Sequence, residues 1–138
     1  MERQYCASTY VIDFENYETL LMYNRKLGKW LQPGGHIVDS ETPIETCIRE
    51  TKEETGIDIK ITGPFFFDGQ YQPIATERYI NKVGDMIDTQ YLSIPLNKEI
   101  NSSEGNPVKW VKLDSLRNMN DVDEEIKVKV LSLYEQYK

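Results

Sequence analysis

Residues 35–57 read Gly-His-Ile-Val-Asp-Ser-Glu-Thr-Pro-Ile-Glu-Thr-Cys-Ile-Arg-Glu-Thr-Lys-Glu-Glu-Thr-Gly-Ile, and this stretch decides the fold. It predicts a helix, because Thr42 fits the N-cap, Pro43 the first helical position and Glu45 the third position of a capping box. Gly56 stands where a helix-ending glycine is expected. Four further residues recur at helical spacing and are predicted to form the buried stripe of this helix: Ile44, Cys47, Ile48 and Thr51.

Three glutamates of the same helix share one face, since Glu50, Glu53 and Glu54 are related by i, i+3 and i+4 spacing. They repel one another in the last turn, where the helix dipole also disfavours negative charge. One interpretation is a solvated acidic face, and the other is a site for a hard divalent cation. Because neither His nor Cys accompanies the carboxylates, such a site suits Mg²⁺, or Mn²⁺ as an alternative, rather than zinc.

The sequence on both sides of this helix alternates as strands do. Strands are predicted over five segments: 5–12, 18–25, 57–62, 85–95 and 108–113. Trp30 and Leu31 form a short extended piece that ends at the breaker Pro33-Gly34-Gly35. Residues 64–84 are interpreted as strand fragments with a long loop, and 96–107 as a polar loop.

A second helix is predicted near the C-terminus, with Asp121 and Glu124 supplying its capping box. Its core-facing stripe is predicted to comprise Val122, Ile126, Val130, Leu133 and Tyr137. Strands on either side of a central helix, with another helix at the end, indicate a mixed α/β sandwich. No repeat, low-complexity tract or linker divides residues 1–138, so we expect a single domain.

Composition limits the class of protein. The 138 residues are 39% hydrophobic and 28% charged, as in globular chains, and no apolar run reaches the roughly 20 residues that cross a bilayer. The first residues lack the apolar region of a signal peptide, and the two cysteines lack metal-ligand spacing. We therefore expect a cytoplasmic protein without membrane spans, disulfides or a zinc site.

The net charge of −7 disfavours a long nucleic acid as partner, because binding to a phosphate backbone needs lysine and arginine. A small phosphorylated ligand is compatible with this net charge, because divalent cations held by carboxylates can neutralise the charge of phosphates. Six acidic and two basic side chains fall within residues 35–57, which concentrates more than half of the net charge there.

The spacing of residues 35–57 resembles the signature of the Nudix hydrolases. Eight of its nine positions match: Gly35, Glu41, Arg49, Glu50, Glu53, Glu54, Gly56 and Ile57. The exception is Thr51, where the family usually has an aliphatic residue. Trp30–Gly35 also resembles the strand and turn before the signature, and Glu104–Trp110 resembles a loop that carries an additional metal-ligating glutamate.

This resemblance implies the Nudix-type α/β/α sandwich with a mixed sheet. It also implies Mg²⁺-dependent hydrolysis of a nucleoside diphosphate linked to another group X, with a mutator-type nucleoside triphosphate pyrophosphohydrolase as the nearest type. Water attacks phosphorus, and either Glu50 or Glu53 accepts its proton. The implied catalytic residues are Glu50, Glu53, Arg49 and Glu41. The implied metal ligands are Glu50, Glu53, Glu54, Glu104 and a backbone carbonyl of Gly34 or Gly35.

Substrate recognition is less determined. Arg25 occupies a place where many relatives have a basic residue facing the phosphates, and Asn118 and Asn120 precede the last helix, where some mutator-type members read a purine. Phe65–Phe67 fit either base stacking or core packing, and His36 is expected to be a satisfied loop residue.

Several alternatives stay open at this point. The substrate alternatives are a dinucleoside polyphosphate, ADP-ribose or a nucleotide sugar, and a non-catalytic nucleotide-sensing domain is a further alternative. Homodimers are common in the family, so a homodimer is compatible with the resemblance.

Overall fold

The computed structural model describes residues 2–82 and 84–138, so residues 1 and 83 of the predicted domain lie outside the described residues. The helices in these ranges are α1 (Pro43–Thr55), α2 (Leu113–Leu116) and α3 (Glu124–Tyr137). The strands are β1 (Arg3–Asp13), β2 (Glu18–Asn24), β3 (Lys29–Leu31), β4 (Gly34–His36), β5 (Ile59–Thr62), β6 (Phe66–Phe67), β7 (Gln70–Tyr71), β8 (Ala75–Ile80), β9 (Asp85–Pro95) and β10 (Val108–Lys112). No helix in the described part of the chain is both long and apolar enough to cross a membrane.

The main sheet is mixed and has the order β10-β2-β1-β9-β5. The long strands β1 and β9 run parallel to each other, while β1 and β2 run antiparallel. Three more strands attach to this row, with β3 pairing with β2, β4 with β1, and β8 with β9. The central strand β1 is buried from Cys6 to Asp13, as expected for a strand that is covered on both faces.

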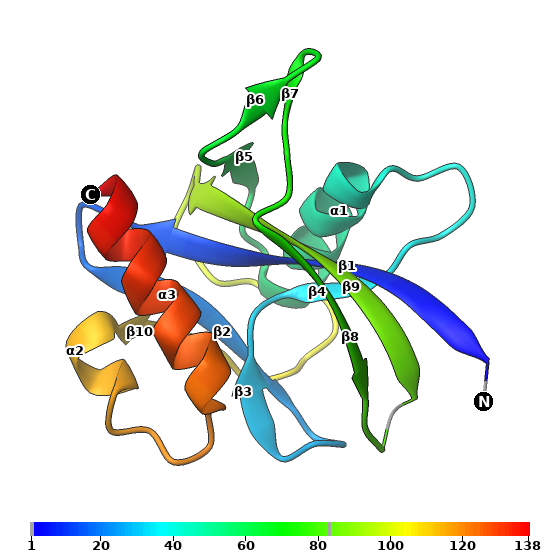
Figure 1. Ribbon diagram of the computed structural model, residues 1–138. Coiled ribbons are helices and arrows are strands. Elements are labelled where there is room, and N and C mark those ends of the chain that lie inside the picture. The colour runs from blue at the N-terminus through cyan, green and yellow to red at the C-terminus, as the bar shows by residue number, and fades with distance from the viewer. Residues whose placement is uncertain (1, 83) are drawn as a thin grey trace.

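The two faces of the sheet carry separate hydrophobic clusters, because successive residues of a strand point to opposite sides. Tyr10 and Ile12 of β1 pack in the cluster of α2 and α3. Ala7 and Val11 pack with Cys47 of α1 in the other cluster. Figure 1 shows α3 lying across the sheet in the foreground. The predicted mixed α/β sandwich with helices on both faces is thus confirmed.

Strand β9 begins and ends where the alternation predicted, and the ends of β1, β2, β5 and β10 differ from the predicted ones by one or two residues. Residues 34–36 form β4 on β1, although Pro33-Gly34-Gly35 was predicted only to end a strand. Residues 64–84 contain the β6–β7 hairpin and β8, which agrees with the predicted strand fragments. The last helix begins at Glu124 with Asp123 as N-cap, so the prediction of Asp121 as cap was wrong. The carbonyl of Asp121 accepts instead from the backbone N–H of Trp30 at 2.8 Å, which holds this segment against β3.

The buried stripe of α1 was predicted only in part. Cys47 and Thr51 are buried as expected, but Ile48 is 42% exposed. The buried face consists of small residues and one glutamate: Thr46, Cys47, Thr51, Glu54 and Thr55. Small side chains let the helix approach β1 closely, and the thiol of Cys47 donates to the carbonyl of Ser8 at 3.3 Å. The helix thus presents mainly small side chains to the sheet, and Cys47 also belongs to the hydrophobic cluster on this face.

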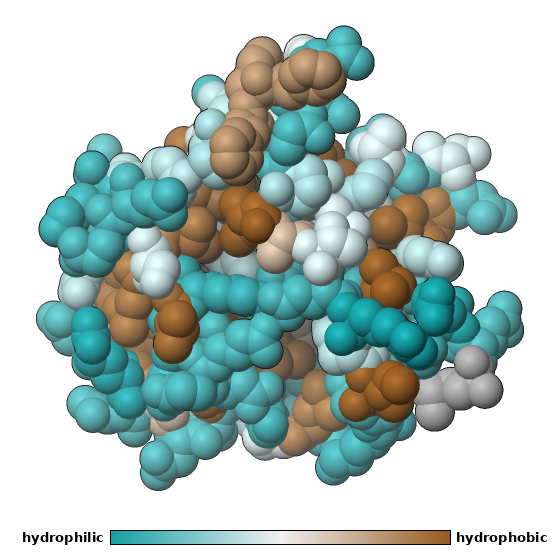
Figure 2. All heavy atoms as spheres, in the orientation of Figure 1, coloured by the Kyte–Doolittle hydropathy of each residue, from teal (hydrophilic) through white to brown (hydrophobic). Residues whose placement is uncertain are grey.

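Phe65, Phe66 and Phe67 are exposed, so base stacking stays a prediction for them. They are between 62% and 71% exposed, so core packing was wrong. They lie in and beside the β6–β7 hairpin, which stands away from the rest of the fold (Figure 1). Figure 2 shows hydrophobic side chains gathered on this projection.

Candidate active site

Helix α1 holds the acidic side chains, and both of its ends are fixed. At its start Thr42 Oγ1 accepts from the N–H of Glu45 at 3.1 Å, and Glu45 Oε1 accepts from the N–H of Thr42 at 2.9 Å, which confirms the capping box. At its end Gly56 has a φ of 81°, and a Cβ there would lie 2.6 Å from the backbone nitrogen of Asn101. Only glycine satisfies both conditions, so the helix ends there.

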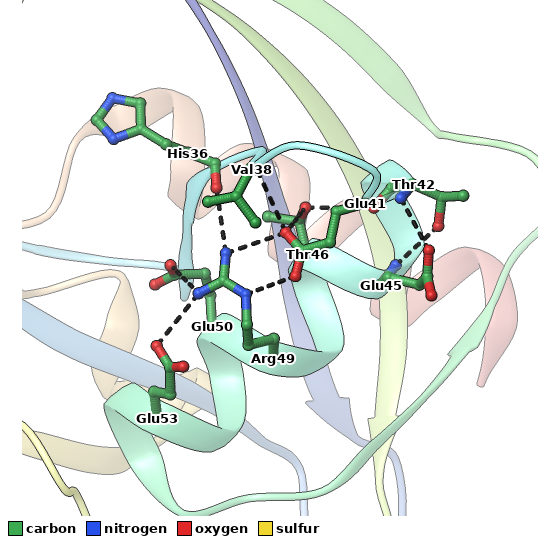
Figure 3. Close-up of polar contacts among 9 residues, drawn as sticks. All are labelled: His36, Val38, Glu41, Thr42, Glu45, Thr46, Arg49, Glu50 and Glu53. Atoms are coloured by element: carbon green, nitrogen blue, oxygen red, sulfur yellow. Dashed lines mark hydrogen bonds and ion pairs between the residues drawn. The ribbon is translucent and has the colours of Figure 1, made fainter.

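Arg49 contacts the three other predicted catalytic residues, Glu41, Glu50 and Glu53 (Figure 3). Its Nε donates to Glu41 Oε2 at 2.6 Å, and its Nη2 donates to Glu41 Oε1 at 3.1 Å. Its Nη1 donates to Glu50 Oε1 at 2.8 Å and to Glu53 Oε2 at 3.2 Å. Nη2 also reaches the carbonyl of His36 at 3.2 Å. One guanidinium thus orients three carboxylates and the strand that faces them.

Glu41 lies in the loop before α1 and is held as a carboxylate. Hydrogen bonds from Arg49 and from Thr46 Oγ1 lower its pKa to about 2, against partial desolvation. The Thr46 hydroxyl donates to Glu41 Oε1 at 2.7 Å. Glu41 is therefore a fixed anchor for Arg49 rather than a group that exchanges protons near neutral pH.

Glu54 differs from the other carboxylates because it is buried. Its Oε1 accepts from the backbone N–H of Gly34 at 3.0 Å. Desolvation raises its pKa to about 8, with further increases from the charges of Glu50, Glu104 and Glu53, against the Gly34 hydrogen bond. Among the described residues, the interactions that affect the Glu54 carboxyl group come from three like charges and the Gly34 N–H, and none comes from a cationic side chain.

The carboxylate of Glu50 lies against Gly35 of β4, where only glycine leaves room for it. A Cβ on Gly35 would lie between 2.5 and 2.8 Å from the carboxylate atoms of Glu50. Desolvation raises the pKa of Glu50, as do the charges of Glu53 and Glu104, while Arg49 opposes the increase. Gly35 therefore permits the closest approach between the carboxylate face of α1 and the sheet.

Glu104 and Arg25 come from the exposed side of the site. Glu104 is close enough to raise the pKa values of both Glu50 and Glu54. Arg25 follows β2, and its Nη1 donates to Asn106 Oδ1 at 2.8 Å, beside Glu104 in the same loop. The structure thus places the predicted loop glutamate near the carboxylates of α1, whereas Arg25 contacts the same loop through Asn106.

The donor set fits a hard divalent cation in chemical type. Glu50, Glu53, Glu54 and Glu104 offer only oxygen, which Mg²⁺ prefers. Burial disfavours the ionised form of Glu54, and a bound cation would favour that form again. Within residues 2–82 and 84–138, no three Asp, Glu, His or Cys side chains converge as a ready-made ligand set. Glu50 and Glu53 instead converge on Arg49, so loading a cation requires their carboxylates to turn.

A cavity of about 510 Å³ adjoins these carboxylates. Its lining includes Gly34 and Gly35, so it begins at the strand that contacts Glu50 and Glu54. From there it extends along β3, β8 and β9 to the start of α3. The volume is in the range of pockets that hold small ligands.

The remaining predicted substrate residues lie elsewhere. Asn118 and Asn120 are not among the described residues that line the cavity. The residues that line it from this part of the chain are Asp123, Glu125 and Ile126. His36 lines the cavity, and its Nε2 lies 2.6 Å from Gln4 Oε1, which agrees with a satisfied loop histidine.

Sequence reasoning missed the polar floor of the cavity. Ser8, Gln32, Asp88 and Gln90 all line it. The sequence contained a signal for two of them. Asp88 and Gln90 are two residues apart and therefore lie on the same face of β9, beside the apolar residues Met86 and Leu92. Ser8 and Gln32 join them only through the pairing of β1 with β9 and the turn after β3.

Comparison with known proteins agrees with this arrangement. The family model of the NUDIX domain matches residues 3–133. A solved structure of a NUDIX-family hydrolase from Clostridium perfringens superposes with a TM-score of 0.85 at 25% identity, over 100% of both chains. The chain therefore belongs to the Nudix family.

Two curated relatives match over parts of their lengths. The Nudix hydrolase YvcI of Bacillus subtilis (strain 168) is 25% identical over 108 residues, which are 74% of this chain and 63% of YvcI. The asymmetrical bis(5'-nucleosyl)-tetraphosphatase of Mus musculus is 44% identical over 39 residues, which are 28% of this chain and 26% of that protein. The chain thus spans less than two thirds of the length of each of these relatives.

Proposed function

We propose that this protein is a Mg²⁺-dependent pyrophosphohydrolase that cleaves a nucleoside diphosphate linked to a group X, with a nucleoside triphosphate as substrate and Mn²⁺ as an alternative metal. The observation that carries the proposal is the junction at Gly34–Gly35. On one side of these residues lie the carboxylates of Glu50 and Glu54, and on the other lies the cavity. A nucleotide that spans the junction places its base in the cavity and its phosphates at the carboxylates.

The side chains of the chain divide the work between positioning and proton transfer. Glu41 fixes Arg49, and Arg49 orients Glu50 and Glu53. Glu50, Glu53, Glu54 and Glu104 would hold the metal, together with a backbone carbonyl of Gly34 or Gly35. When bound, Mg²⁺ would lower the pKa of a coordinated water and offset phosphate charge. Either Glu50 or Glu53 accepts the proton of the attacking water at a carboxylate oxygen.

Substrate contacts follow from the same placement. Arg25 is proposed to face the phosphates, since its guanidinium lies against the loop of Glu104. Asn118 and Asn120 stay predictions as base contacts. In addition, we propose that residues 1–138 form one domain, which acts in the cytoplasm on small nucleotides and neither on long nucleic acids nor at membranes. A homodimer stays a prediction that light scattering would test.

A second candidate substrate is a dinucleoside polyphosphate, because the similar mouse protein is a bis(5'-nucleosyl)-tetraphosphatase. ADP-ribose and nucleotide sugars are further alternatives within the family. A non-catalytic nucleotide-sensing role is disfavoured, since all three α1 carboxylates, Glu50, Glu53 and Glu54, are present.

A substrate panel with Mg²⁺ tests the proposal. Release of phosphate or pyrophosphate is measured from nucleoside triphosphates, dinucleoside polyphosphates, ADP-ribose and nucleotide sugars, with wild type beside Glu53→Gln and Glu54→Gln. Turnover by wild type that both variants lose supports the hydrolase. Nucleotide binding by wild type without turnover of any substrate would establish the sensing role instead.

A further inference from the structure

The C-terminal end of α1 leaves the carbonyl of Glu53 without a donor from the residues that follow it at helical spacing. The last carbonyls of a helix need partners from elsewhere, because the helix ends before their own donors arrive. Here the Gly56 N–H donates to the carbonyl of Lys52 at 2.9 Å. The Ile57 N–H donates to Thr55 Oγ1 at 3.1 Å. Both N–H groups that could close the turn on Glu53 therefore donate elsewhere.

Ser103, in the loop of residues 96–107 between β9 and β10, supplies two donors to this carbonyl. Its backbone N–H donates to the carbonyl oxygen of Glu53 at 3.2 Å, and its Oγ donates to the same oxygen at 2.9 Å. A carbonyl oxygen has two lone pairs, so it can accept both hydrogen bonds. Two donors from one residue fix both the position and the orientation of that residue on the helix end.

Glu104 follows Ser103 directly, and the residue after it is also held. The Gly105 N–H donates to Ser102 Oγ at 3.1 Å. Gly105 has a φ of 73°, in the left-handed region that glycine adopts readily. Glu104 itself is exposed, so the core does not hold it. Its placement therefore depends on the hydrogen bonds of its neighbours in the loop.

Other contacts hold the same loop at residues further from Glu104. Asn97 Oδ1 accepts from the N–H of Asp58 at 2.7 Å, and the Asn101 N–H donates to the carbonyl of Thr55 at 2.9 Å. These contacts lie seven and three residues before Glu104 in sequence. They bring the loop to the end of α1, but the hydrogen bonds that adjoin Glu104 on this side are those of Ser103.

The residue that accepts from Ser103 belongs to the carboxylate face of α1. Glu53 thus offers its backbone carbonyl to the loop, while its side chain lies with those of the other two glutamates of this face. The charge of Glu104 raises the pKa values of Glu50 and Glu54, so the loop carboxylate lies near the helix carboxylates. One backbone carbonyl therefore connects the two sources of negative charge.

We propose that Ser103 is a positioning residue, which through its two hydrogen bonds to the Glu53 carbonyl keeps the carboxylate of Glu104 beside the carboxylates of α1 and so raises the affinity of the site for a divalent cation. The inference rests on the proposed function only in taking Glu104 to be a metal ligand.

Binding of Mn²⁺ in the absence of nucleotide tests the proposal apart from catalysis. Free Mn²⁺ is measured by its electron paramagnetic resonance signal during titration of the whole chain. Ser103→Ala removes the hydroxyl and retains the N–H, so it is expected to weaken Mn²⁺ binding by about 3- to 10-fold. Ser103→Thr retains both donors and should bind Mn²⁺ within about 2-fold of wild type.

A double-mutant cycle with Glu104→Gln distinguishes positioning from a general loosening of the loop. Because Ser103 acts through the carboxylate of Glu104, Ser103→Ala should weaken Mn²⁺ binding by less than about 2-fold in the Glu104→Gln background. Asn101→Ala is the matched control, since Asn101 joins the same loop to α1 through its backbone N–H, which alanine retains. It should bind Mn²⁺ as wild type does. Ser103, Glu104 and Asn101 are exposed, so these variants are expected to fold, and circular dichroism checks this.

Each outcome supports or overturns the proposal. Equal Mn²⁺ affinity of wild type and Ser103→Ala overturns it, and so does a loss of the same size in the Glu104→Gln background. Absence of Mn²⁺ binding by wild type, or weak binding by Ser103→Thr, also overturns it. A loss in Ser103→Ala that disappears in Glu104→Gln, in a chain that hydrolyses no nucleotide with Mg²⁺, would support the positioning role and refute the hydrolase. Hydrolysis by wild type with unchanged Mn²⁺ affinity in Ser103→Ala would do the reverse.

Discussion

Arg49 Nε lies 2.6 Å from Glu41 Oε2, and this contact joins the loop before α1 to the middle of the helix. The remaining guanidinium nitrogens reach Glu50, Glu53 and the carbonyl of His36. The planar fork of arginine is required for such contacts in several directions, because the ammonium group of a lysine acts as a single charge at one point.

Arg49→Lys is therefore expected to lower kcat by about 10-fold or more, through loss of carboxylate orientation. Steady-state hydrolysis of the substrate identified in the panel measures the effect. Lys52→Arg is the control, since Lys52 lies on the same helix but pairs with Asp58. Unchanged kcat in Arg49→Lys would contradict the positioning role.

Glu54→Gln should lower turnover by more than about 100-fold, because loss of one metal ligand removes several kcal/mol of transition-state stabilisation. The fold is expected to survive, since the glutamine oxygen can still accept from the Gly34 N–H. Calorimetry with Mg²⁺ alone should show weakened binding, and circular dichroism should show an intact fold. An active Glu54→Gln enzyme would remove Glu54 from the ligand set.

The two glycines of β4 are predicted to respond differently to alanine. A Cβ on Gly35 meets the end of the Glu50 side chain, which can move, so Gly35→Ala should fold and lose at least about 10-fold in kcat. A Cβ on Gly34 would lie 2.6 Å from the carbonyl oxygen of Ala7 and 2.7 Å from the Cα of Ser8. Backbone cannot move so readily, so Gly34→Ala should be destabilised by at least about 1–3 kcal/mol. Urea unfolding and activity, measured on both variants, separate the two effects.

Glu41 makes a pH-dependent contribution to stability. Its pKa is lowered to about 2 in the folded chain from an ordinary value of 4.5. The unfolded state therefore binds the proton more tightly, so the contribution is complete above pH 4.5 and is lost as the pH falls toward 2. The difference in unfolding free energy between wild type and Glu41→Gln should shrink over this window. Urea titrations at pH 6 and pH 3 measure it, and a constant difference would be evidence against the ionic contact with Arg49.

Thr51 and Thr55 form a matched pair for a test of buried hydroxyl groups. Thr51 Oγ1 has no hydrogen-bond partner among the described residues. Thr51→Val should therefore raise the unfolding free energy by about 1 kcal/mol. Thr55 Oγ1 donates to the carbonyl of Thr51 at 2.6 Å and accepts from the N–H of Ile57 at 3.1 Å, so Thr55→Val should be destabilising. A shift of the same sign in both variants would contradict this interpretation.

Residue spacing predicted the parts of the molecule that depend on local physics. Capping residues and the terminal glycine gave α1 its bounds, and alternation gave β9 its bounds. The helical spacing of Glu50, Glu53 and Glu54 places them on one face of α1 without reference to any tertiary contact. Local rules suffice for these features, because they involve neighbours within one turn or one strand.

Other features depend on contacts between distant segments and were not predictable in this way. Ile48 of α1 is 42% exposed, and the carbonyl of Asp121 accepts a hydrogen bond from the N–H of Trp30, while Asp123 is the N-cap of α3. The floor of the cavity needs Ser8 and Asp88 side by side, 80 residues apart in sequence. Periodicity contains no information about which strand pairs with which.

The position of β4 fixes the distance between the acidic face of α1 and the cavity. Three residues, Gly34 to His36, are registered on Ser8, Ala7 and Cys6 of the central strand. Gly34 and Gly35 contact Glu54 and Glu50 of α1, the carbonyl of His36 contacts Arg49, and all three residues line the cavity, so the two regions are coupled through β4. A ligand anchored by its base in the cavity would therefore present one particular phosphate to the carboxylates. The short strand β4 would thereby determine which bond in a chain of phosphates is cleaved.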